Sequence, residues 1–265
     1  MHRPLRWAQD NGLVRIANGN CHWFTHSARE CLQYLDVLDG REIPAELFDL
    51  VVGTGNVKPD TTSMIFDLAS SPHEVSVVEI STHKQLRYRD WHLHLDQFRI
   101  KSRELGLHPD ILSDRLKVPL GSRNGNFLRE FEMPHFYRDL FVETTLTMQT
   151  DDELFLDLIE IGERISGPIV FVDHFNVPRD DGMRFPERDR LTRTLRNYAA
   201  SSGDLVYETA PAIMRHGQQA ALVDVNHYAN GFEPVVAAEM LGAIDDLARG
   251  RGRILTFALE GLRQA

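Results

Sequence analysis

Short apolar runs alternate along the chain with segments whose apolar residues recur at helical spacing. The apolar runs are typical of buried strands and lie at Leu13–Ala17, Leu47–Val52, Val75–Ile80, Ile169–Asp173 and Leu205–Glu208. The periodic segments predict helices at 21–38, 61–69, 89–105, 151–165, 187–201 and 232–248. A further strand is expected at Arg253–Leu259.

This alternation predicts an α/β fold in which helices cover both faces of a mainly parallel sheet. With right-handed crossovers, the expected architecture is a three-layer α/β/α sandwich with a flavodoxin-like sheet of five strands. Residues 83–150 are too many for a simple connection. We therefore expect one domain over residues 1–265, with an insertion at about 83–150 that forms a cap or side wall. A functional site is expected beyond the carboxyl ends of the strands.

Composition and charge narrow the classes of function. The chain has 265 residues, a formal net charge of −10 and 42% hydrophobic residues, an ordinary globular composition. The acidic balance argues against a general nucleic-acid surface. No run is long and apolar enough for a membrane span, and the N-terminal segment lacks a secretory apolar region, so a cytoplasmic location is expected. Two cysteines, Cys21 and Cys31, suit a reducing compartment. The oligomeric state is left open.

Cys21 and the pair Asp224 and His227 are the candidate catalytic residues. Cys21 follows the first predicted strand at the start of a predicted helix, where the helix dipole and backbone N–H groups favour a thiolate. Asp224 stands three residues before His227 and shortly before the last predicted helix. Such a carboxylate fixes the imidazole tautomer, so that the other ring nitrogen can act as a base.

Further polar residues at the strand ends are candidates for supporting roles. Backbone N–H groups near a nucleophile can stabilise a developing oxyanion, and this role is predicted for Cys21, Gly55, Asn56 and Thr82. The expected substrate contacts are Asn20, His22, Ser81, His83, His174, Asn176, Arg179 and Tyr228.

Structural explanations compete with these functional ones. A free cysteine is usually a packing residue, and a lone histidine can simply cap or pack against the last helix. The pairs His22/His26 and His92/His94 have spacings that allow metal ligation. A chain with 12 histidines produces such spacings by chance, and no carboxylate completes a site, so no metal is predicted.

The order of these motifs resembles the SGNH, or GDSL-like, hydrolase superfamily. Gly19-Asn20-Cys21 occupies the place of that superfamily's nucleophile block, and Asp224-x-x-His227 matches its last block. Gly53 or Gly55 stands where its glycine block belongs. The third block, Gly-x-Asn-Asp, is absent, and Ser81-Thr82-His83 stands there instead.

The Gly-Asn-Cys start is similar to a narrower branch, the capsular-polysaccharide biosynthesis acetyltransferase-like proteins, with the Gly-Ser-Cys-Phe-Ala branch as a related comparison. The resemblance covers roughly residues 13–82 and 167–245. It implies an SGNH-type fold, a cysteine in the nucleophile position and, in the first branch, coenzyme A binding.

The resulting hypothesis is an acyltransferase with a Cys-His-Asp site. It would move an acyl group from a thioester of coenzyme A or a carrier to a hydroxyl or amine of a sugar or metabolite. No permanently bound cofactor is expected, and a coenzyme A thioester is the expected co-substrate. An SGNH-type esterase or thioesterase uses the same residues and is the first alternative. A non-catalytic sugar- or acyl-binding module is the second, because the third block is missing. In a third, His227 and Asp224 act as the base while Cys21 only lines the pocket.

Overall fold

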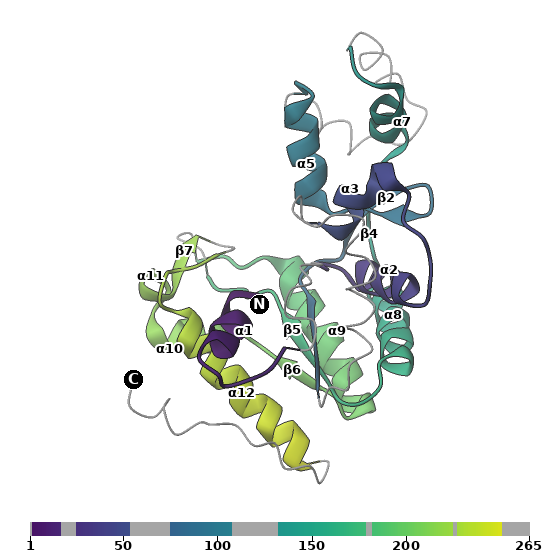
Figure 1. Cartoon of the computed structure of the whole chain (residues 1–265). Coiled ribbons are helices and arrows are strands. Elements are labelled where there is room, and N and C mark those ends of the chain that lie inside the picture. The colour runs from purple at the N-terminus through teal and green to yellow at the C-terminus, as the bar shows by residue number, and fades with distance from the viewer. Residues whose placement is uncertain are drawn as a thin grey trace. The chain divides into compact units, whose positions relative to one another are not determined.

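The computed structural model describes residues 2–16, 25–53, 75–107, 132–178, 182–224 and 227–250 (Figure 1). Their internal contacts divide them into two compact units. The described part of the first unit comprises residues 2–16, 75–82, 151–178, 182–224 and 227–250. That of the second comprises residues 25–53, 83–107 and 132–150.

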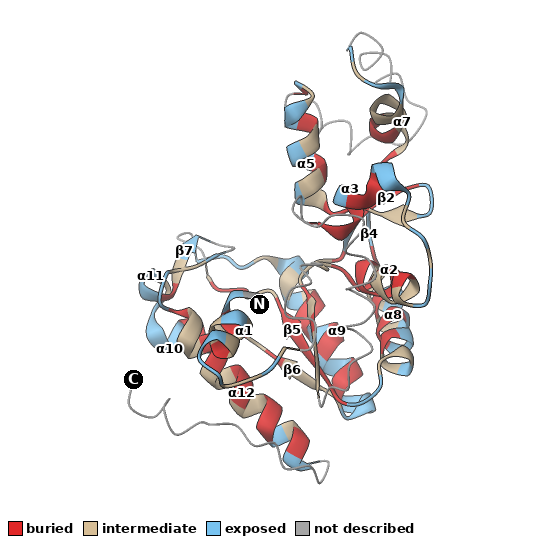
Figure 2. Ribbon diagram, viewed as in Figure 1, coloured by how far each residue is buried: buried red, intermediate tan, exposed pale blue. Residues whose placement is uncertain are grey.

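A parallel sheet of three strands forms the centre of the first unit, in the order β1 (Ser76–Ile80), β5 (Ile169–Asp173) and β6 (Leu205–Tyr207). The register pairs Ile80 with Asp173, and Val172 with Tyr207. All five residues of β5 are buried, as Figure 2 shows. A strand that is covered on both faces reads as a continuous apolar run, which explains the sequence IVFVD.

Helices pack on both faces of this sheet. Successive side chains of a strand point to opposite faces. Val170 and Val172 of β5 belong to a core cluster with Ala8 and residues of the last helix, whereas Phe171 meets Tyr198 edge-on at 5.5 Å. The helices and the small hairpin strands of this unit are α1 (His2–Asp10), α8 (Asp151–Arg164), α9 (Pro186–Ser202), α10 (Ala210–His216), α11 (Gln218–Ala221), β7 (Leu222–Asp224), β8 (His227–Tyr228) and α12 (Glu233–Gly250).

The second unit is built on an antiparallel sheet with the order β3 (Trp91–His92), β2 (Lys84–Tyr88) and β4 (Thr145–Met148). Its helical elements are α2 (Ala28–Leu38), a 3-10 turn at Ala45–Leu47, α3 (Phe48–Val52), α5 (Leu95–Glu104) and α7 (His135–Glu143). A separate core cluster joins the sheet to the turn at Ala45–Leu47, α3, α5 and α7, and includes Leu50, Leu86, Leu93, Phe98 and Phe141.

Several predicted elements form where the sequence places them. The strands at 75–80, 169–173 and 205–208 correspond to β1, β5 and β6, and the helices at 151–165, 187–201 and 232–248 correspond to α8, α9 and α12. Three parallel strands are therefore shown, and the five-stranded flavodoxin-like sandwich stays a prediction.

The predicted strand at 47–52 is wrong, because this segment is helical. Phe48, Leu50, Val51 and Val52 are all buried there, so the apolar run carries no strand alternation. Gly53 ends the helix in the left-handed conformation with φ 79°. A glycine at that position is a common helix stop, and it is the local signal that separates helix from strand here.

Three other predicted boundaries need correction. Residues 13–16 form no strand, and the N–H of Leu13 instead donates to Ala8 O at the end of α1. The helix expected at 21–38 begins only at Ala28, since Ser27 caps it by accepting from Glu30 N. The helix expected at 89–105 is shortened to 95–104 by the β2–β3 hairpin. The helix at 61–69 and the strand at 253–259 lie outside the described residues.

The expected insertion at 83–150 contributes its described residues, 83–107 and 132–150, to the second unit. Residues 25–53 belong to the same unit, although the sequence places them in the scaffold. The single domain with a cap or side wall stays a prediction.

A substitution at Gly53 tests how tightly the second unit packs around this residue. Its φ is positive, and a Cβ there would lie 2.6 Å from Cδ2 of His94. We expect Gly53→Ala to lower the free energy of unfolding by about 2 kcal/mol or more, since left-handed strain and overpacking add. Urea titration followed by circular dichroism measures this change.

Gly106→Ala is the matched control, because Gly106 has φ 76° and a Cβ there meets nothing within 4 Å. An equal loss of stability in both variants would contradict the close contact with His94.

Candidate functional site

The hairpin of β7 and β8 brings Asp224 and His227 together. These two short strands pair antiparallel, with Asp224 opposite His227 and Leu222 opposite Tyr228. Asp224 Oδ2 and Oδ1 lie 2.8 and 2.9 Å from Nδ1 of His227. This is the contact that the three-residue spacing predicts.

The contact leaves Nε2 of His227 as the ring nitrogen that points away from the carboxylate. A carboxylate at Nδ1 favours the tautomer with its proton on that nitrogen. Nε2 then carries the lone pair and can accept a proton from a substrate or a thiol. The His227 side chain is 66% exposed and that of Asp224 is 50% exposed, so water and solutes reach the pair.

Tyr228 anchors this hairpin to the core of the first unit. Its ring lies 5.4 Å from that of Phe175 and 5.8 Å from that of Phe232, measured between centroids. Ala229 N donates to Ala221 O at 2.8 Å and closes the base of the hairpin. Burial raises the pKa of Tyr228, so the phenol stays protonated. The structure therefore places this predicted substrate contact in the packing beneath His227.

Asp173, which the sequence interpretation did not select, ends β5 at the carboxyl edge of the parallel sheet. It is buried, and it accepts hydrogen bonds from Thr192 Oγ1 at 2.7 Å and from Thr209 N at 3.3 Å. Burial raises the pKa of Asp173 from 3.8 to about 6, although these two hydrogen bonds oppose the shift. The signal in the sequence was a carboxylate directly at the end of a fully apolar strand.

His174 and Asn176 follow Asp173 at the same edge. The ring of His174 stacks on that of Phe175 at 4.9 Å. The amide of Asn176 is buried, donating to Phe185 O at 2.9 Å and to Asp189 Oδ1 at 2.8 Å, and accepting from Phe185 N at 3.0 Å. These three bonds tie the connection after β5 to the start of α9, which is a structural role. Substrate contact by either residue stays a prediction.

Ser81 and Thr82 follow β1 and are partly buried. Because Ile80 pairs with Asp173, they leave the sheet at the same edge as Asp173 and His174. His83 belongs to the second unit, is buried, and accepts from Gln149 N through its carbonyl at 2.9 Å. The oxyanion and substrate roles predicted for these residues stay predictions.

The remaining predicted site residues lie outside the described residues. They are Asn20, Cys21, His22, Gly55, Asn56 and Arg179. The nucleophile and two of the predicted oxyanion donors therefore stay predictions. Cys31, the other cysteine, is buried in α2.

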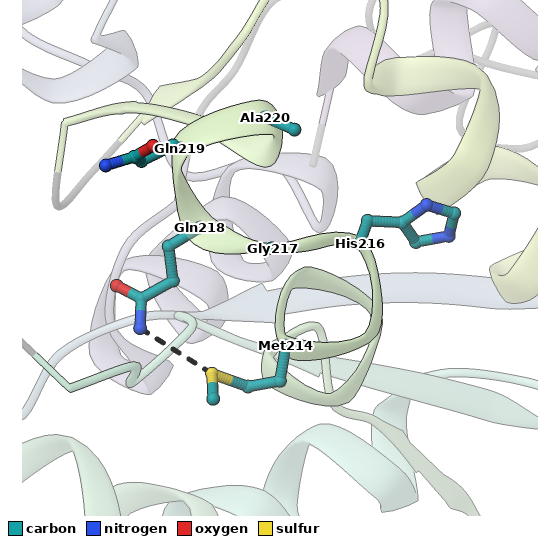
Figure 3. Close-up of a pocket in the computed structure, with 6 residues that line it drawn as sticks. All are labelled: Met214, His216, Gly217, Gln218, Gln219 and Ala220. Carbon is teal, nitrogen blue, oxygen red and sulfur yellow. Dashed lines mark hydrogen bonds between the residues drawn. The ribbon is translucent and has the colours of Figure 1, made fainter.

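A hollow of about 480 Å³ lies on the segment that leads into β7 (Figure 3). It is lined by Met214, His216, Gly217, Gln218, Gln219 and Ala220. Gln218 reaches back to Met214, with Nε2 at 3.7 Å from the sulfur atom. Two carboxamides and an imidazole give this surface donors and acceptors for a polar small molecule.

The described residues hold neither a cluster of metal ligands nor a helix that could span a membrane. Within those ranges, no group of three or more His, Cys, Asp or Glu side chains has an arrangement that holds a metal ion. No described helix combines the length and apolar character that crossing a bilayer requires.

Comparison with known protein families relates most of the chain to one of them. The family model of the TviD N-terminal domain matches residues 1–243. No curated protein and no solved structure matches the chain.

The carboxyl of Asp173 predicts a pH dependence of stability in the first unit. Its raised pKa means that the folded state keeps a proton between about pH 4 and pH 6 that the unfolded chain has released. The free energy of unfolding should therefore fall as the pH rises through this range. Asp173→Asn should remove this dependence and keep stability at pH 7, because the amide has no charge to bury.

Urea unfolding at pH 4.5 and pH 7 measures the effect, with Asp246→Asn on the exposed side of α12 as the control. Equal pH slopes for the wild type and Asp173→Asn would rule out this role for the carboxyl.

Proposed function

The chain belongs to the TviD N-terminal domain family, and we propose that it is an acyltransferase of polysaccharide biosynthesis. The family name suggests an acetyltransferase-like function in making a polysaccharide. The observation that carries the proposal is the contact of 2.8 to 2.9 Å between Asp224 and Nδ1 of His227. A carboxylate-oriented imidazole is the proton-transfer group that acyl transfer requires.

In the proposed reaction, Cys21 is the nucleophile and an acyl thioester of coenzyme A is the donor. His227 takes the thiol proton through Nε2, and the sulfur atom forms a bond to the acyl carbon. The carbon–sulfur bond of the donor then breaks, and the released coenzyme A thiolate takes the proton from His227. Transfer of the acyl group from the thioester of coenzyme A to the thiol of Cys21 makes a second thioester. This exchange is nearly balanced in free energy, so the acyl group stays activated.

The second half of the reaction transfers the acyl group to a hydroxyl or amine of a sugar. His227 takes the proton of the acceptor as its oxygen or nitrogen attacks the acyl carbon. The bond between that carbon and the Cys21 sulfur then breaks, and the imidazolium returns the proton to the thiolate. Backbone N–H groups at Cys21, Gly55, Asn56 and Thr82 are the proposed oxyanion donors.

Hydrolysis is the second candidate function, and one observation favours it. The His227 side chain is 66% exposed, so water can reach the base. An esterase or thioesterase would use water in place of the sugar acceptor, through the same three residues. The rate of coenzyme A release, measured with and without sugar acceptors, separates the two activities. A hydrolase releases coenzyme A without an acceptor, whereas a transferase releases it continuously only when an acceptor is present.

Intact-protein mass spectrometry after incubation with acetyl-coenzyme A tests the nucleophile. We expect an adduct of one acetyl group in the wild type and none in Cys21→Ala. Cys31→Ala is the matched control and should keep the adduct, because Cys31 is buried in α2. An adduct that persists in Cys21→Ala would place the nucleophile elsewhere.

Asp224→Asn tests the orientation of His227. An amide in place of the carboxylate removes the charge that stabilises the imidazolium and can favour the wrong tautomer. We expect adduct formation to slow by about 100-fold or more, with an unchanged melting temperature because both side chains are at least half exposed. The rate is obtained by quenching the reaction at successive times and recording the intact mass. An adduct that forms at the wild-type rate would contradict the role of Asp224.

A further inference from the structure

The antiparallel sheet of the second unit has one apolar face and one polar face. Leu86 and Tyr88 of β2 are buried in the core cluster of this unit, whereas Arg87 between them is exposed on the opposite face. The register sets His92 of β3 on one side of Arg87 and Thr145 of β4 on the other. Side chains directly opposite one another share a face, so these three polar residues lie together. A solvated sheet face of this kind is open to a ligand.

Helix α2 brings a second arginine to this polar face. Gln33 Nε2 donates to His92 O at 2.9 Å, and Gln33 Oε1 accepts from His92 N at 2.7 Å. These two bonds act as strand pairing would at the outer edge of the described sheet, and they fix α2 against β3. Arg29 lies four residues before Gln33, so both side chains are on the same side of the helix.

Arg41 supplies a third guanidinium group, which is fixed over the ring of Trp91. Its Cζ lies 3.9 Å from the centroid of that ring. Arg41 Nη2 donates to Asp90 O at 2.8 Å, and Arg87 Nε donates to Arg89 O at 2.6 Å. Both acceptors are backbone carbonyls of the β2–β3 turn. These bonds position the guanidinium groups and leave their charges in place, which is what an anion-binding site requires.

Carboxylates near these arginines offset only part of their charge. Asp36 Oδ2 lies 3.4 Å from Arg41 Nη1, and Asp90 Oδ1 lies 3.5 Å from Arg87 Nη2, both at the long limit of a hydrogen bond. Exposed ion pairs of this kind contribute little free energy and can be exchanged for a better anion. The side chains of Arg41 and Arg87 are 33% and 56% exposed, so a solute reaches both.

His92 lies in the combined electric field of the three arginines. Burial lowers the pKa of His92 to about 4, and the positive charges of Arg29, Arg87 and Arg41 add to this effect. Its Nδ1 atom is enclosed and has no hydrogen-bond partner among the residues that the structure describes. Cations that converge on one point repel one another, and an anion among them would turn this repulsion into attraction.

The number of arginines indicates the class of anion. Guanidinium groups recognise carboxylates and phosphates through paired N–H donors. A phosphate ester carries a charge of about −1.5 to −2 at pH 7 and three acceptor oxygens, whereas a carboxylate carries one charge and two oxygens. Three guanidinium groups from separate segments therefore match a phosphate better. The chain has a formal net charge of −10, so a patch this small suits a single phosphate group and not a nucleic-acid backbone.

We propose that the arginines around His92 form a binding site, on the polar face of this sheet, for the phosphate group of a small molecule. The three residues are Arg29, Arg41 and Arg87. The proposal rests on the residues of the second unit alone and does not depend on the acyl-transfer reaction.

Binding is measured on the full chain by NMR of ¹⁵N-labelled histidine rings at pH 7 and constant ionic strength, with inorganic phosphate, methyl phosphate and acetate as probes. We expect the His92 signals to shift and saturate with a phosphate probe at a Kd at least about 10-fold below that of acetate, while the His216 signals stay fixed. Tighter binding of methyl phosphate would identify the ligand as a phosphate ester, and tighter binding of inorganic phosphate would identify it as the free ion. No saturable shift of His92 with either phosphate probe, or equal affinity for acetate, would overturn the proposal.

Arg87→Gln and Arg29→Gln test the arginines themselves. Each substitution removes a charged donor, so we expect the affinity for phosphate to fall by about 10-fold or more. Arg29→Gln leaves the bond between Arg87 and the turn intact, and it decides the matter if Arg87→Gln disturbs the fold. Arg99→Gln is the matched control, because Arg99 is 54% exposed on α5 and pairs with Asp96 at 3.4 Å. Wild-type affinity in both test variants, or an equal loss in Arg99→Gln, would contradict a site at these arginines.

Discussion

The parallel pairing of β5 with β1 and β6 is the constraint on which the first unit depends. Parallel strands bring their carboxyl ends to one edge of the sheet, and the register sets Ile80 beside Asp173 there. Asp173 then ties this edge to α9 through Thr192 and to the residue before α10 through Thr209 N. The chain from α10 to β8 continues from this anchored point and carries Asp224 and His227.

Asp173 and Asp224, two carboxylates of the first unit, have different roles because one is buried and the other is exposed to water. Asp173 is buried, and its raised pKa and two hydrogen bonds suit a structural tie. Asp224 is half exposed, so water solvates its charge while it contacts Nδ1 of His227. A carboxylate that keeps its charge is the better partner for an imidazolium. The chemistry of the pair therefore follows from its place on a surface hairpin that Tyr228 and Ala229 fasten to the core.

The spacing of apolar residues along the chain is enough to predict part of the secondary structure. The continuous apolar runs of β1 and β5 and the long periodic segments of α8, α9 and α12 are predictable because pattern and burial agree there. The prediction of a strand at 47–52 is wrong because every apolar residue of this run is buried, including the consecutive Leu50, Val51 and Val52, so no strand alternation separates it from a helix, and Gly53 is the local mark of a helix end. Asp173 is not predicted from the sequence for a different reason, since its burial arises from elements distant along the chain, which carry Thr192 and Thr209. The spacing of Asp224 and His227 was informative because both partners lie on one short hairpin.

The central claim is that His227, oriented by Asp224, activates the thiol of Cys21. The most direct measurement is the rate at which iodoacetamide alkylates Cys21 at pH 6, where an ordinary thiol is almost fully protonated and reacts slowly. The account predicts fast alkylation in the wild type and a rate at least 10-fold lower in His227→Gln, with Cys31 unreactive in both. Equal rates in the two proteins would contradict the claim and leave His227 with no part in activating the thiol.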